Sequence, residues 1–215
     1  MIDYFPPLEP GVCYHIYNRG NNRENIFLKE ENYAYFLNKY ALYMTGVLDT
    51  LVYNLLPNHF HIVARIRRKE DIAPAPSGVP GVIDFPSRED LESLSVGDIV
   101  SELFRRFFIA YAKAINKQEG RVGSLFQKNF KRRPVKSDSH FANLIYYIHT
   151  NARLHGICHD FRDWPHSSYF SILSDGATRL QRAEVLRWFD SKEAFEQQHR
   201  QYLDLKNIDD LIIED

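Results

Sequence analysis

Alternation of apolar and polar positions predicts a first strand over residues 12–19. From Glu30 to Met44, aromatic and aliphatic side chains recur at helical spacing, which predicts a helix. Residues 48–55 and 59–67 then predict two strands, and the short turn Leu56-Pro57-Asn58 makes them an antiparallel hairpin. The first third of the chain therefore has the order strand, helix, strand, strand.

The pattern changes after the hairpin. Residues 68–95 include a stretch rich in Pro and Gly, so we expect a linker or an inserted segment there. Residues 100–116 predict a basic amphipathic helix, 124–135 a strand or extended hairpin, and 139–155 a second strong helix. The resulting order β-α-β-β-α-β-α predicts an α+β fold, with a ferredoxin-like antiparallel sheet and helices packed on it.

Composition narrows the class of protein. The chain has 215 residues, 44% of them hydrophobic, enough for one substantial core. We expect one domain over residues 1–175 and an acidic, mainly helical tail over 176–215. Two cysteines fit no disulfide framework, and no apolar run approaches the roughly 20 residues that span a bilayer. Together with an N-terminus that lacks signal-peptide features, this predicts a cytoplasmic protein with no membrane partner.

Charge is distributed unevenly although the net charge is −1. Between Phe104 and Lys136, ten basic residues face a single acid, Glu119, which gives about +9. Five of these residues, together with Arg19, are candidates for contacting phosphates: Arg105, Arg106, Lys131, Arg132 and Arg133. The alternative for the segment is a solvated outer face, and its interleaved phenylalanines could either stack on bases or fill the core.

His59 and His61 are the first candidate for chemistry. Strand periodicity places both imidazoles on one face of the sheet and Phe60 on the other. A divalent metal could be held on the first face while the second face packs a core. The motif is short, so it needs support from another part of the chain.

The helix predicted over 139–155 supplies that support. Tyr147 and Asn151 are spaced i and i+4, so they share one margin of its apolar stripe. Tyr146 falls about 100° further round, on the opposite flank. A tyrosine at the edge of a core face is usually structural, but Tyr147 has a carboxamide one turn later and a histidine strand on which the helix could pack.

Five segments in this order and spacing resemble the HUH-type single-tyrosine transposases, most closely the branch of REP-associated tyrosine transposases. The segments are Tyr14–Gly20, Leu56–Val63, Gly123–Gln127, Tyr147–Asn151 and Trp164–Tyr169. The resemblance covers about residues 12–170 and implies an HUH endonuclease type of fold.

The resemblance also implies a mechanism. His59, His61 and Asn151 would hold Mg²⁺ or Mn²⁺, which polarises a scissile phosphate of single-stranded DNA. Tyr147 would attack the phosphorus to give a 5′-phosphotyrosine, and the stored bond would let a 3′-OH rejoin strands later. His15 and His149 are candidates for assisting the phenol, whose ordinary pKa of about 10 makes it a weak nucleophile. The implied partner is single-stranded DNA, folded as palindromic hairpins; a homodimer is left open.

Two segments depart from the pattern of the family. Ala152 follows Asn151 where proline is common, and Phe126–Phe130 replaces a Trp-x-x-Arg-Phe segment, so the DNA sequence recognised is not implied. One alternative function is a catalytically silent DNA- or RNA-binding regulatory protein on the same scaffold. Another is a His-x-His metallohydrolase, although the chain is short for a (β/α)₈ barrel and too helical for a cupin.

Overall fold

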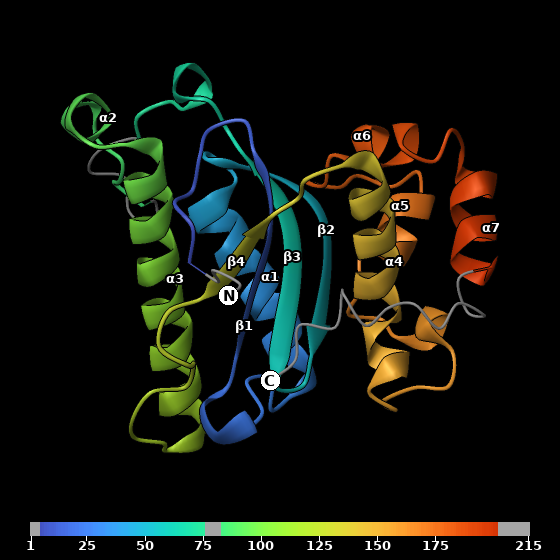
Figure 1. The fold of residues 1–215 in the computed structure, drawn as a ribbon. Helices are drawn as coiled ribbons and strands as arrows, with labels where there is room; N and C mark the ends of the chain where they lie inside the picture. Colours follow the sequence, from blue (N-terminus) through green and yellow to red (C-terminus); the bar gives the residue numbers. More distant parts are fainter. Residues whose placement is uncertain (1–4, 76–82, 202–215) are drawn as a thin grey trace.

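A four-stranded antiparallel sheet forms the centre of the computed structural model, which describes residues 5–75 and 83–201 (Figure 1). The strands are β1 (Cys13–Arg19), β2 (Leu48–Leu56), β3 (His59–Ile66) and β4 (Lys131–Pro134), in the spatial order β2-β3-β1-β4. Every neighbouring pair is antiparallel. This is the ferredoxin-like arrangement that the sequence predicts, and the α+β class is confirmed.

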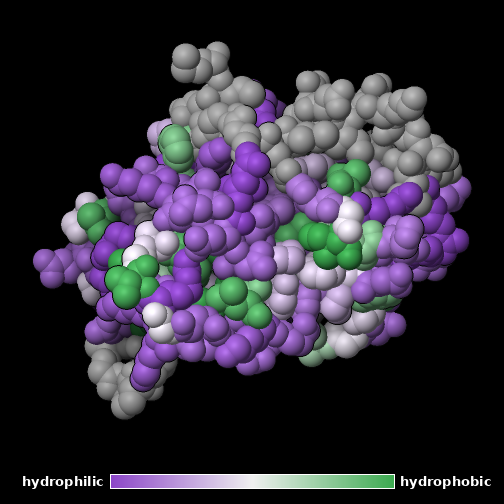
Figure 2. Space-filling model, turned by 90° about the horizontal axis from the view of Figure 1, so that it is seen from below, coloured by the Kyte–Doolittle hydropathy of each residue, from purple (hydrophilic) through white to green (hydrophobic). Residues whose placement is uncertain are grey.

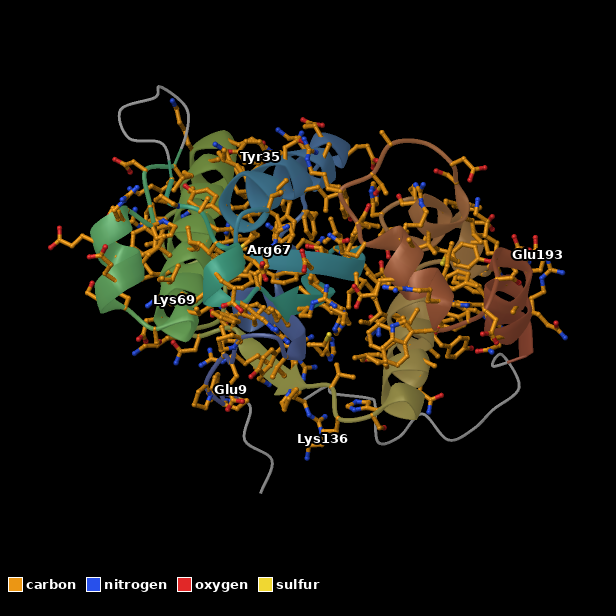
Figure 3. All side chains as sticks on the ribbon, turned by 90° about the horizontal axis from the view of Figure 1, so that it is seen from above. Glu9, Tyr35, Arg67, Lys69, Lys136 and Glu193 are labelled. Carbon is orange, nitrogen blue, oxygen red and sulfur yellow. The ribbon has the colours of Figure 1, made fainter. Side chains whose placement is uncertain are left out.

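Helices cover both faces of the sheet. The α-helices are α1 (Glu30–Met44), α2 (Arg88–Ser93), α3 (Val96–Glu119), α4 (Asp138–Leu154), α5 (Tyr169–Leu173), α6 (Arg182–Arg187) and α7 (Lys192–Gln201). Short 3₁₀ turns are η1 (Asn21–Arg23), η2 (Lys69–Asp71) and η3 (Phe161–Asp163). Figures 1 and 3 show α1 and α3 on one face and α4 to α7 on the other.

Two apolar cores follow from strand alternation. Phe60 and Ile62 of β3 point to the α1 and α3 face, where they pack with Phe36 and Phe104. Val63 points to the other face, and the second core there contains side chains of α4 and of the segment up to Phe195. Residues 182–201 therefore pack through their apolar side chains against α4, the helix that carries Tyr147 and is called the tyrosine helix below.

Local signals explain where the two long helices begin and end. The hydroxyl of Ser95 accepts a hydrogen bond from the Asp98 amide at the start of α3, and Gly120, with φ of 63°, ends that helix in a left-handed conformation. Ser137 caps α4 in the same way by accepting from the His140 amide. Both helices thus start on the serine side chains that favour a helix N-terminus.

The segment between β3 and α3 contains two short helical pieces, η2 and α2, within residues 68–95. Part of that predicted insertion, residues 76–82, lies outside the described residues. In the described ranges, no helix is long and apolar enough to cross a membrane. The surface seen in Figure 2 is mainly hydrophilic with small separate hydrophobic areas.

Candidate active site

The histidine pair lies on the sheet face that α4 covers. His59 is 7% exposed and His61 is 1% exposed, and their rings are 5.0 Å apart and perpendicular. Phe60, between them, is fully buried in the core on the opposite face. The alternation predicted from the sequence therefore places both imidazoles beneath the tyrosine helix.

Helix α4 brings the other two predicted residues to the histidines. The Tyr147 ring meets the His61 ring edge to face, with centroids 5.8 Å apart, and the Asn151 amide oxygen lies 3.2 Å from His59 Nε2. Tyr146 points elsewhere, with its ring 5.8 Å from that of His199 in α7. The four predicted residues converge on one site, and the adjacent tyrosines face different surroundings.

The hairpin turn before His59 is held by backbone contacts with the segment that follows β1. The Gly20 amide donates to the Asn58 carbonyl at 2.8 Å, and the Ile26 and Phe27 amides donate to the Pro57 carbonyl. Gly20 is needed there, since a Cβ atom would lie 2.0 Å from the Glu24 carbonyl oxygen. These contacts set the position of Asn58 and thereby that of His59.

Asn58 determines the orientation of the His59 ring. Its amide nitrogen donates to the Arg23 carbonyl, so its amide oxygen faces His59 Nδ1, at 2.6 Å. His59 must donate from Nδ1, which leaves a lone pair on Nε2. Nε2 and the Asn151 oxygen are then two acceptors 3.2 Å apart, a pairing that a shared cation would stabilise.

These residues fit a divalent cation. Two ligands about 2.1 Å from an octahedral ion lie roughly 3.0 Å apart, close to the separation of His59 Nε2 and Asn151 Oδ1. His61 Nε2 is buried and has no hydrogen-bond partner among the described residues. Burial lowers the pKa of His61 and keeps it neutral, as ligation requires. In the described part of the chain, no cluster of three or more His, Cys, Asp or Glu side chains could hold a metal ion. The candidate donors gathered here are two imidazole nitrogens and one amide oxygen.

Strand alternation divides the basic residues between two faces. Arg19 pairs with His59 across β1 and β3, and Arg133 pairs with His15 across β1 and β4. Lys131 lies opposite Tyr17 and places its ammonium 6.0 Å from that ring. Arg19, Lys131 and Arg133 therefore lie on the sheet face that carries the histidines.

The other three basic candidates lie apart from the site. Arg105 and Arg106 both pair with Glu102 on α3, at 2.6 and 2.8 Å. Arg132 points to the α3 face of the sheet and donates to the Pro6 carbonyl. The six candidates thus form two separate groups.

The phenylalanines of the basic segment fill the core. Phe104 and Phe107 are fully buried, and Phe126 and Phe130 are less than 10% exposed. Phe108, which is partly exposed, lines a groove of about 900 Å³ between α3 and residues 123–130, and the edges of Phe126 and Phe130 also reach its wall. For the four buried rings, the prediction that they fill the core is confirmed.

Sequence reasoning missed Asn54 and His155. Asn54 is fully buried opposite His61 in β2 and donates to the Ile148 carbonyl of α4 at 2.6 Å. His155, one turn after Asn151, lies edge to face with His59, with ring centroids 5.1 Å apart. A hairpin with a two-residue turn pairs position 54 with position 61, so the sequence did hold a signal for Asn54.

Of the two histidines expected to assist, the structure places one at the site. His15 Nε2 lies 2.9 Å from His61 Nδ1. His149 instead points to Ser168 and His199, at 2.8 and 2.9 Å, away from Tyr147. The expectation for His149 was wrong, because successive residues on a helix are turned by about 100° and two positions after Tyr147 is the far side.

Comparisons with known proteins identify one relative by sequence and one solved structure by fold. No family model matches the chain. A protein of Haemophilus influenzae described as "Putative REP-associated tyrosine transposase" is 23% identical over 123 residues, 56% of this chain. The chain spans 58% of the length of that curated relative.

A solved structure shares the fold. It is described as a REP-associated tyrosine transposase bound to a REP hairpin, has a TM-score of 0.55 and 16% identity, and the match covers 83% of this chain and 88% of that one. The resemblance read from the sequence motifs is confirmed: the chain is similar to REP-associated tyrosine transposases in sequence and has their fold.

Proposed function

We propose that this chain is a metal-dependent endonuclease and strand transferase that acts on hairpin-forming single-stranded DNA through a 5′-phosphotyrosine. The observation that carries the proposal is the convergence of Tyr147, Asn151, His59 and His61 from two elements about 90 positions apart in sequence. Similarity to REP-associated tyrosine transposases, one of them bound to a REP hairpin, supports the substrate class.

His59, His61 and Asn151 would hold Mg²⁺ or Mn²⁺. A cation held there would supply Lewis acidity to the scissile phosphate. Asn58 holds His59 through Nδ1, and Arg19, Lys131 and Arg133 provide positive charge on the same face for the flanking phosphates.

Tyr147 provides the nucleophile. Its phenolic oxygen bonds to the phosphorus as the proton leaves for solvent or a nearby base, and the bond to the 3′ oxygen breaks. The departing oxygen takes a proton and becomes a 3′-OH. In the reverse direction, a 3′-OH attacks the phosphotyrosine and releases the phenol, so strands rejoin without a nucleotide cofactor.

A second candidate function is a nucleic-acid-binding protein that does not cleave. The observation in its favour is the burial of Tyr147, which is only 1% exposed in the core between α4 and the sheet. Cleavage requires α4 to move enough for a phosphate to reach that hydroxyl. DNA binding by the basic face, which consists of Arg19, Lys131 and Arg133, does not require this movement. The two functions differ in whether DNA is cut.

Metal-dependent cleavage of a labelled hairpin oligonucleotide tests the proposal. His59→Ala and His61→Ala should each reduce cleavage by at least about 100-fold, and a chelator should do the same to the wild type. Most DNA affinity should remain, because the basic face is intact. Cleavage that resists both the chelator and the substitutions, in variants that stay folded, would contradict the proposal.

A further inference from the structure

His15 occupies a place that the proposed chemistry leaves unexplained. It lies on β1, is 2% exposed, and stacks against both Tyr17 and His61. Its Nε2 is 2.9 Å from His61 Nδ1, the nitrogen that points away from the candidate metal site. A buried polar ring in the middle of a strand is costly unless it is hydrogen-bonded, and among the described residues His15 is bonded through Nε2 alone.

The proton between the two rings can sit on either nitrogen. A ligand imidazole must be neutral, because a ring protonated on both nitrogens has no lone pair for a cation. A neutral imidazole carries a single N–H. If His15 donated, His61 would carry its proton on Nε2 and would have no lone pair to offer a cation.

We propose that His15 is a positioning residue that accepts the Nδ1–H of His61 and so holds the Nε2 lone pair of His61 toward the cation. This inference rests on the proposed function. It gives the two ligand imidazoles matching arrangements, with Asn58 accepting from His59 and His15 accepting from His61. Partners of this kind fix the tautomer and the orientation of ligand histidines.

Rigid placement makes His15 suited to that role. Its strand is paired on both sides, since position 15 lies opposite Val63 in β3 and Arg133 in β4. The stacked contacts with Tyr17 and His61, at centroid separations of 4.8 and 5.1 Å, prevent the ring from turning away. His15 therefore offers an acceptor at a fixed point.

Mn²⁺ affinity of the full chain without DNA tests the role, measured from the electron paramagnetic resonance signal of free Mn²⁺. His15→Leu removes the acceptor and should weaken Mn²⁺ binding by about 10-fold or more. His15→Gln can place its amide oxygen near the position of Nε2, so its affinity should stay within about threefold of wild type. His199→Gln, a buried histidine away from the site, should bind Mn²⁺ as the wild type does.

The outcomes distinguish a failure of the role proposed for His15 from a failure of the proposed metal site. If His15→Leu binds like the wild type, or if His15→Gln is as weak as His15→Leu, the role of His15 is overturned. Should the leucine variant fail to fold, His15→Asn replaces it, because its shorter side chain is polar but does not reach the Nε2 position; equal affinities of the Asn and Gln variants would then overturn the role. A wild-type chain that binds no Mn²⁺ would overturn the proposed metal site and, with it, this inference.

Discussion

Side-chain hydrogen bonds connect the sheet to the tyrosine helix α4. Asn54 is the clearest example, because its amide nitrogen reaches the Ile148 carbonyl, in the turn of α4 that also holds Tyr147. It lies opposite His61 in the register of β2 and β3. One buried amide thus holds α4 against the strand that carries the candidate metal ligands.

Replacing Asn54 should therefore cost stability. Asn54→Ala removes the hydrogen bond and leaves a small cavity, so the free energy of unfolding should fall by about 2 kcal/mol. Chemical denaturation measures this, with Asn38→Ala as the control, because Asn38 is exposed on α1 and alanine favours a helix. Equal stabilities of the two variants would show that the Asn54 contact contributes nothing.

At the scale of elements, the positions of the regular segments could be read from sequence, although α3 (Val96–Glu119) extends beyond the predicted 100–116 at both ends. The positions of the irregular segments could not be read in this way. The helix predicted over 30–44 is α1 with the same limits, since its apolar spacing is continuous. The strand expected over 124–135 contracts to Lys131–Pro134. Residues before it form bridges and turns, with Gly123 and Asn129 at positive φ, which periodicity does not detect.

Part of the candidate site was predictable for a related reason. Strand and helix periods, which are local properties of the chain, place His59 with His61 and Tyr147 with Asn151. That the two pairs meet was implied by the resemblance to a known family. The separation of the basic residues into two groups also follows from strand period, but it requires knowing which strand lies beside β1. The pairing of β4 with β1 is a tertiary contact, so no local sequence pattern predicts it.

Strand β4 provides the next prediction. Lys131→Gln with Arg133→Gln should reduce the slope of log affinity against log salt for single-stranded DNA by about 1.4, since roughly 0.7 is lost for each phosphate contact. Arg105→Gln with Arg106→Gln removes the same charge but disrupts pairs with Glu102, so its effect should be less than half as large. Identical slope changes in the two double variants would refute this division.

At the scale of the whole molecule, a buried chain of hydrogen bonds joins the C-terminal helix to the tyrosine helix. His199 donates from Nδ1 to the Phe195 carbonyl, at 2.7 Å, so its Nε2 must accept from His149. His149 then accepts from the Ser168 hydroxyl, which itself accepts from the Tyr53 amide. No sequence pattern predicts these hydrogen bonds, because their members lie on α7, α4 and β2 and on the residue before α5.

From these buried hydrogen bonds we expect the stability of the protein to depend on pH. Burial lowers the pKa of His199 from 6.5 to about 4, so the neutral form is favoured in the folded state. The associated stability is fully present above pH 6.5 and is lost as pH falls from there through about 4, at a cost of about 3 kcal/mol. Protonation would also face His149 and Tyr169, whose rings lie against His199.

Urea denaturation between pH 4 and 7.5 measures that dependence. His199→Gln should flatten the decline, whereas His159→Gln, which changes an exposed histidine, should leave the decline as it is in the wild type. A decline of the same steepness in the His199 variant would assign the acid sensitivity to other groups.

The central claim concerns the bond between this protein and DNA. A pool of labelled single-stranded oligonucleotides that fold as hairpins is incubated with the chain and Mg²⁺, and the products are separated under denaturing conditions. We expect an adduct that carries a 5′-phosphate on Tyr147 by peptide mass spectrometry, present in Tyr146→Phe and missing in Tyr147→Phe. An adduct on Tyr146 or on any other residue, or cleavage without a protein–DNA bond, would contradict the account.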